Sequence, residues 1–109
     1  MVAEREKHLK RNLDKIVEDL KRKYNPEKII LFGSFASGRV KEYSDLDLLI
    51  VKNTNKRFWD RIKEVVKLCD YDVGVDFLVY TPEEYEGELR NNIFFREEIV
   101  KKGKVIYGK

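Results

Sequence analysis

Acidic side chains at two points of the sequence could hold divalent cations for phosphoryl-transfer chemistry. Asp45 and Asp47 lead directly into an apolar run, and Asp76 interrupts a second apolar run further along the chain. Side chains alternate along a strand, so we expect Asp45 and Asp47 to project to the same side. Carboxylates this close repel each other unless a cation lies between them, and Mg²⁺ favours such oxygen ligands. Three acids from two neighbouring strands could hold two metal ions, which clamp the attacking and leaving oxygens of a phosphoryl transfer.

A Gly-Ser pair supplies the second half of this pattern. Gly33 and Ser34 follow an apolar segment, and ten residues separate Ser34 from Asp45. Glycine lets the backbone approach a ligand closely, and free N–H groups at the start of a helix or turn bind anions. Arg39 and Lys41 lie in the intervening loop, either as solvated charges or as contacts to phosphates. We include Arg39 in the predicted nucleotide-binding set.

Together these residues resemble the signature of the nucleotidyltransferase superfamily typified by DNA polymerase beta. The resemblance covers nearly the whole chain and rests on the apolar strand, Gly33-Ser34, the spaced Asp45-x-Asp47 and the later strand acid Asp76. The small size is similar to the minimal nucleotidyltransferase subgroup, whose members often serve as antitoxins beside HEPN-domain toxins. One departure is Ser37, since many relatives carry a basic residue at that position.

The resemblance implies roles for each residue of the pattern. Nucleotide binding falls to Gly33, Ser34 and Arg39, whereas the catalytic and metal-binding residues are Asp45, Asp47 and Asp76. The implied cofactor is Mg²⁺, in a two-metal site, and the implied substrate is ATP. A structural interpretation of the acids also exists, in which Asp45 caps a turn, Asp47 pairs with a lysine and Asp76 is a salt-bridged strand residue.

The acceptor of the transferred nucleotide is open. The resemblance favours an antitoxin that transfers AMP to a HEPN-type toxin, at a tyrosine. One alternative is modification of a small molecule such as an aminoglycoside, with an acceptor pocket that a homodimer interface could complete. Another is a non-catalytic module that neutralises its partner by contact. Nucleic acid is not expected, except as an RNA-linked acceptor.

The composition bounds the fold and the compartment. The chain has 109 residues, of which 42% are hydrophobic and 39% charged, with a net charge of +3. We expect one domain over residues 1–109. Neither a signal peptide nor an apolar run of membrane length is evident, and the lone Cys69 cannot form an internal disulfide. These features predict a cytoplasmic protein, and the abundance of lysine and glutamate resembles thermophile proteins.

The periodicity of apolar residues predicts an α/β (α+β) fold in which a small mixed sheet of about four strands is packed against helices. Strands are expected at 28–32, 44–51, 73–80 and 104–107. Helices are expected at 4–24, 56–69, 82–89 and 93–102, with a turn and short helix at 33–38. Thr81 and Glu84 predict a capping box, and Thr54 or Asn55 is expected to cap the helix at 56–69.

Three further side chains have chemistry of their own but receive structural interpretations. Trp59 lies on an apolar helical stripe and is predicted to be a core residue rather than a stacking platform. Cys69 is predicted to be a small buried hydrophobe. His8, the single histidine, lies on the first helix and is expected to be exposed and far from the Gly-Ser and Asp-x-Asp pattern.

Overall fold

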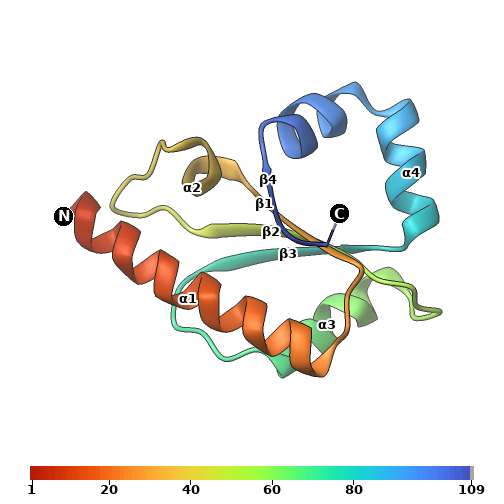
Figure 1. Ribbon diagram of the computed structural model, residues 1–109, viewed down its shortest axis with the longest axis horizontal. Helices are drawn as coiled ribbons and strands as arrows, with labels where there is room; N and C mark the ends of the chain where they lie inside the picture. The colour runs from red at the N-terminus through yellow and green to blue at the C-terminus, as the bar shows by residue number, and fades with distance from the viewer. Residues whose placement is uncertain (109) are drawn as a thin grey trace.

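The sheet has four strands, as the sequence predicts (Figure 1). The computed structural model describes residues 1–108. The strands are β1 (Lys28–Phe32), β2 (Leu46–Val51), β3 (Val75–Tyr80) and β4 (Lys104–Gly108). Their order is β3-β2-β1-β4, with β2 parallel to β3 and the other two pairs antiparallel. The mixed α+β architecture is thereby confirmed.

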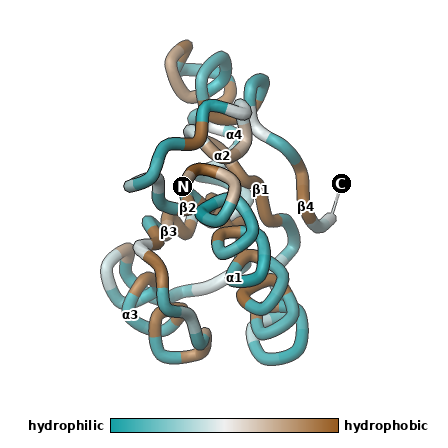
Figure 2. The backbone as a smooth tube through the Cα atoms, turned by 90° about the vertical axis from the view of Figure 1, so that its left-hand side faces the viewer, coloured by the Kyte–Doolittle hydropathy of each residue, from teal (hydrophilic) through white to brown (hydrophobic). Residues whose placement is uncertain are grey.

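Helices cover both faces of this sheet. They are α1 (Val2–Lys23), α2 (Gly33–Ser37), α3 (Phe58–Leu68), α4 (Pro82–Asn91) and the π-helix η1 (Phe95–Lys101). In Figure 1, α1 and α3 lie below the sheet, and α4 and η1 lie above it. Figure 2 shows α1 as largely hydrophilic with intermittent hydrophobic residues, which is typical of a helix that buries one stripe.

Strand β2 is buried on both faces, and this decides where its acid points. Leu48 packs with the core under α1 and α3, whereas Leu49 and Val51 pack with α4 and η1. Asp47 has the parity of Leu49 and Val51, so it faces the α4 and η1 side at the end where β2 begins. A charged side chain therefore stands at the mouth of an otherwise apolar strand.

Several predicted boundaries need correction. Strand β2 begins at Leu46 rather than residue 44, because the Ser44 hydroxyl accepts a hydrogen bond from the Lys41 amide at 2.8 Å and so closes a turn. Strand β3 begins at Val75 rather than residue 73. The predicted cap of α3 is wrong, since α3 begins after Arg57 and has no side-chain cap. The last helix is a π-helix rather than an α-helix.

The capping box of α4 is confirmed. The Glu84 amide donates to the Thr81 hydroxyl at 3.2 Å, and the Glu84 carboxylate accepts from the Thr81 amide at 2.8 Å. In residues 1–108 no helix has the length and apolar character needed to cross a membrane.

The prediction for Trp59 is wrong, since its side chain is 70% exposed. Val65 defines the inner side of α3, and Trp59 and Val66, which lie about two helical turns apart, are both on its exposed flank. Cys69 is half-buried, and burial raises the pKa of its thiol to about 11. His8 is also half-buried rather than exposed, with Nε2 3.1 Å from the Asp72 carboxylate.

Candidate active site

Two of the predicted acids lie side by side at one end of the sheet. The parallel register of β2 and β3 places Asp47 opposite Asp76. On the other side of β2, the antiparallel register places Phe32, the last residue of β1, opposite Asp47. Asp47 and Asp76 are close enough for a protonated Asp47 to donate a hydrogen bond to its neighbour. The site therefore forms where β1 ends and where β2 and β3 begin.

The environment of Asp47 disfavours its charge. Burial contributes most, followed by the negative charge of Asp76 and the hydrogen bond to it, and then by the charge of Asp45; together they raise the pKa of Asp47 from 3.8 to about 6. The parallel register keeps the two residues side by side, so their carboxylates remain neighbours in the folded protein. A cation between them would remove the repulsion.

Gly33 is required by the position of Asp47. A Cβ atom on Gly33 would overlap the Asp47 carboxylate, and the backbone φ angle of +80° lies in the left-handed region. Helix α2 begins at this glycine, so Ser34 follows within the same turn, and its hydroxyl donates to the Ser44 hydroxyl at 3.1 Å. Gly33 of the predicted Gly-Ser pair thus lies directly against the Asp47 carboxylate, and Ser34 follows it in the same turn.

Asp45 is held differently from the other two acids. It precedes β2, leaves 52% of its side chain exposed, and lies over Gly74, where a Cβ would come within 2.6 Å of the Asp45 carboxyl carbon. Arg5 of α1 approaches Asp45 Oδ1 to 3.4 Å through Nη2 and donates from Nε to the Ser44 carbonyl at 2.9 Å. Sequence reasoning missed Arg5, because nothing local distinguishes it from the other charges of an amphipathic helix.

The donor set suits a hard divalent cation. Mg²⁺ typically binds one or two protein carboxylates and completes its shell with water and substrate phosphate. Asp47 and Asp76 provide such a pair of oxygen ligands, whereas Asp45 is turned toward Arg5. Within residues 1–108 no group of three or more His, Cys, Asp or Glu side chains is gathered closely enough to hold a metal ion. Asp45 would have to turn away from Arg5 to join the pair.

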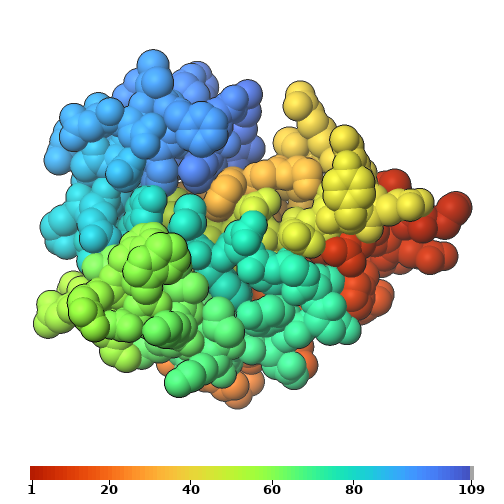
Figure 3. Space-filling view, turned by 180° about the vertical axis from the view of Figure 1, so that it is seen from behind, coloured from red at the N-terminus to blue at the C-terminus, as the bar shows by residue number. Residues whose placement is uncertain are grey.

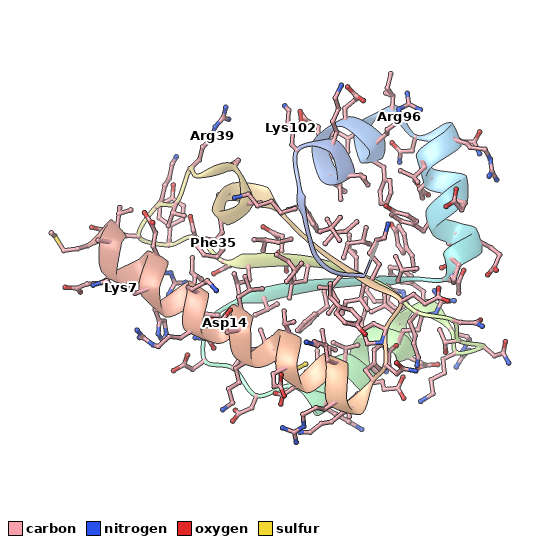
Figure 4. All side chains as sticks on the ribbon, viewed as in Figure 1. Lys7, Asp14, Phe35, Arg39, Arg96 and Lys102 are labelled. Atoms are coloured by element: carbon pink, nitrogen blue, oxygen red, sulfur yellow. The ribbon has the colours of Figure 1, made fainter. Side chains whose placement is uncertain are left out.

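A charged cavity of about 380 Å³ lies on the β1 side of Asp47. It is lined by Gly33, Ser34, Ser37, Arg39, Glu98 and Lys102. In Figure 4, Arg39 and Lys102 project from separate segments on the same side of the sheet. Figure 3 shows the hollow from behind, between the yellow loop after α2 and the blue C-terminal segment. The sequence interpretation included Arg39 but missed Glu98 and Lys102, which lie about sixty residues further along the chain.

An apolar groove of about 510 Å³ lies on the β3 side of Asp47. Asp47 and Asp76 line it together with Phe58, Trp59, Ile62 and Val66. Phe58 and Trp59 contact each other edge to face, with their ring centroids 5.1 Å apart. The exposed Trp59 is therefore part of a concave surface that reaches the carboxylates.

Comparison with known proteins assigns the family. The nucleotidyltransferase domain model matches residues 13–107. Two proteins of Methanocaldococcus jannaschii, each named "Putative protein adenylyltransferase", are similar in sequence. One is 32% identical over 102 residues, which cover 87% of this chain and 94% of that protein. The other is 40% identical over 77 residues, which cover 65% of this chain and 52% of that protein, so the chain matches about half of its length.

Solved structures share the fold. A crystal structure from Sulfolobus solfataricus, described as a "putative nucleotidyltransferase", has a TM-score of 0.71 at 22% identity and covers 99% of this chain and 87% of its own. A toxin–antitoxin structure described as MntA-HpeT has a TM-score of 0.54 at 23% identity, covering 90% and 73% of the two chains. A toxin–antitoxin structure with AMP-PNP also has a TM-score of 0.54, at 22% identity, and covers 90% and 74%.

Proposed function

Because this chain belongs to the nucleotidyltransferase domain family, we propose that it transfers AMP from ATP to a hydroxyl group of a protein partner. The observation that carries the proposal is the register of β2 and β3, which holds Asp47 against Asp76 directly beside Gly33. The names of the relatives from Methanocaldococcus jannaschii support a protein as the acceptor.

Two hollows lie beside Asp47. We assign the charged cavity to the phosphates of ATP and the apolar groove to the acceptor. The charged cavity with Gly33, Ser34 and Arg39 suits the phosphates, because its cation and hydroxyl groups complement their negative charge. Mg²⁺ held by Asp47, Asp76 and, after it turns, Asp45 would neutralise charge on the phosphates. The single domain proposed for residues 1–109 would then contain the complete nucleotide site.

The direction of the acceptor follows from in-line geometry. The acceptor oxygen forms a bond to the α-phosphorus as the bond to the bridging oxygen breaks and pyrophosphate leaves. Attacking and leaving oxygens lie roughly opposite each other, so pyrophosphate in the cavity on the β1 side places the acceptor on the β3 side. There the apolar groove reaches Asp76, whose carboxylate would accept the proton of the hydroxyl.

An aromatic acceptor fits the chemistry of this groove. Phe58, Trp59, Ile62 and Val66 offer apolar and aromatic surface for the ring of a tyrosine, with its hydroxyl toward Asp76. The similarity of fold to toxin–antitoxin structures supports a toxin as the protein that carries this tyrosine, and the motif resemblance implies that the toxin is of the HEPN class. We therefore propose an antitoxin role in the cytoplasm, where the free thiol of Cys69 would stay reduced.

A label-transfer experiment tests the proposed function. The chain is incubated with Mg²⁺ and ATP labelled at the α-phosphate, together with a purified HEPN-type toxin as the candidate acceptor. We expect label on a tyrosine of that protein, and loss of labelling in the Asp47→Asn and Asp76→Asn variants.

A double variant of the acids separates catalysis from contact. If the Asp45→Asn, Asp47→Asn double variant still neutralises the partner in cells, contact alone suffices and the proposed reaction is wrong. If that variant still binds the partner but no longer neutralises it, the chemistry is required. Label on an aminoglycoside in place of the protein would favour a small-molecule acceptor.

A further inference from the structure

Lys102 reaches the Gly-Ser pair from the far end of the chain. Strands β4 and β1 are antiparallel, with Lys104 opposite Leu31. If this register is continued past the strand ends, two residues after Leu31 and two residues before Lys104, it brings Lys102 beside Gly33. Both residues line the charged cavity, together with Ser34 and Arg39. The pairing of β4 with β1 therefore brings a cation from the end of the chain to the cavity beside Gly33.

The backbone around Lys102 is closely packed. A Cβ atom on Gly103 would overlap the Ile99 carbonyl oxygen and would lie 2.8 Å from the carbonyl oxygen of Leu31. The chain after Lys102 thus packs directly on the backbone of β1. The preceding segment, η1, is a π-helix, and π-helical turns are rare and often lie at functional sites.

The charged residues of the cavity indicate how Lys102 would respond to a bound anion. Lys102 Nζ is 2.7 Å from Glu98 Oε2, and the two side chains are 65% and 43% exposed. Arg39 makes no ion pair with another residue of the described 1–108 segment, and Ser37 contributes no charge. A bound anion would compete with Glu98 for the Lys102 ammonium group. The cavity then offers it two cations, Arg39 and Lys102.

We propose that Lys102 is a phosphate-binding residue, which leaves Glu98 and pairs with the terminal phosphates of the nucleotide when ATP binds. This inference rests on the proposed function, because it needs the triphosphate to occupy the cavity beside Gly33. Glu98 acts as the competing anion. The stronger its ion pair with Lys102 is, the weaker the binding of the nucleotide should be. The two residues should therefore have opposite effects on affinity for ATP.

The neighbouring ion pair on the same π-helix supplies matched controls. Lys101 Nζ lies 3.5 Å from Glu97 Oε1 with the same spacing of four residues, but neither residue lines the cavity. Calorimetric titration of ATP and of AMP, each with Mg²⁺, is carried out on wild type and on variants at all four positions. Because AMP lacks the terminal phosphates, its binding should not depend on Lys102.

We expect Lys102→Gln to weaken ATP binding roughly tenfold, which is what losing one partly exposed charged contact costs. Glu98→Gln should strengthen ATP binding several-fold, since it removes the competing anion. Lys101→Gln and Glu97→Gln should bind ATP as the wild type does, and Lys102→Arg should retain most of the affinity. No variant should change the affinity for AMP.

Three results would overturn the inference. Equal ATP affinity in Lys102→Gln and Lys101→Gln would remove Lys102 from the site. Weaker ATP binding in Glu98→Gln, matching that of Lys102→Gln, would show that the pair only supports the structure. A folded wild type that binds no ATP would overturn the proposed function as well. The first result, obtained with a wild type that binds ATP, would overturn the role of Lys102 alone and leave the proposed function standing.

Discussion

Replacing Asp47 with asparagine should make the metal-free protein more stable while removing its nucleotide binding. Burial and the adjacent Asp76 raise the pKa of Asp47 to about 6, so its ionised form is disfavoured in the folded state. Asparagine has nearly the same shape, carries no charge, and can donate a hydrogen bond to Asp76. The substitution therefore removes a repulsion that the function, in our account, requires.

The size and sign of the effect follow from the pKa. A carboxyl with a folded-state pKa of about 6 and an ordinary value of 3.8 destabilises the ionised folded state by about 3 kcal/mol. Because Asp47 is only partly buried, solvent screening reduces this to about 1–2 kcal/mol. Between pH 3.8 and pH 6 the folded state binds more protons than the unfolded state, so stability falls as the pH rises through this range.

Urea unfolding in the presence of a chelator measures this difference. Well above pH 6, Asp47→Asn should unfold at a higher urea concentration than wild type, and the difference should shrink as the pH falls below 3.8. Asp45→Asn is the matched control, because Asp45 is exposed, pairs with Arg5 and contributes least to the raised pKa of Asp47, so its loss should stabilise the fold much less than Asp47→Asn does. A variant that is less stable than wild type well above pH 6, or a difference that does not change with pH, would refute the reasoning.

Further substitutions test other parts of the account. Gly33→Ala should lower stability by more than about 1 kcal/mol in urea unfolding and abolish ATP binding, because its Cβ would overlap the active-site carboxylate. Gly87→Ala, which meets nothing within 4 Å in α4, should stabilise the protein by about 0.5–1 kcal/mol. Glu84→Gln should cost about 1–3 kcal/mol without changing ATP affinity, because the guanidinium of Arg61, whose side chain is 8% exposed, loses the negative charge of its partner 2.7 Å away. Trp59→Ala should change stability by less than about 0.5 kcal/mol and leave ATP binding intact, but slow transfer to the protein acceptor. Normal transfer by Trp59→Ala, or ATP binding by Gly33→Ala, would contradict the respective assignments.

The elements of the fold were predictable from local sequence signals. The apolar runs gave all four strands, and the Thr81–Glu84 capping box gave the start of α4. The predicted start of β2 was wrong because the Ser44 hydroxyl closes a turn, so the strand begins two residues later, at Leu46. The π-helix was not predicted, because the spacing of apolar residues that indicates a helix does not distinguish a π-helix from an α-helix.

The predicted acids and the Gly-Ser pair are neighbours because they flank adjacent strand ends. Sequence spacing carries that information, since each lies immediately beside an apolar run. Arg5 and Lys102 carry no such signal, because they reach the site only through the packing of α1 and the pairing of β4 with β1. The prediction that Trp59 is a core residue was wrong for a related reason. Helical periodicity does not distinguish a buried stripe from the wall of an exposed groove.

The central claim is that the carboxylates beside Gly33 form a metal-dependent nucleotide site. Calorimetric titration of ATP into wild type and Asp47→Asn, with and without Mg²⁺, tests it most directly, because the urea experiment establishes separately that the variant is folded. The account predicts binding by wild type that requires Mg²⁺ and is lost in Asp47→Asn. Equal binding by the two proteins, or wild-type binding that is indifferent to Mg²⁺, would contradict it.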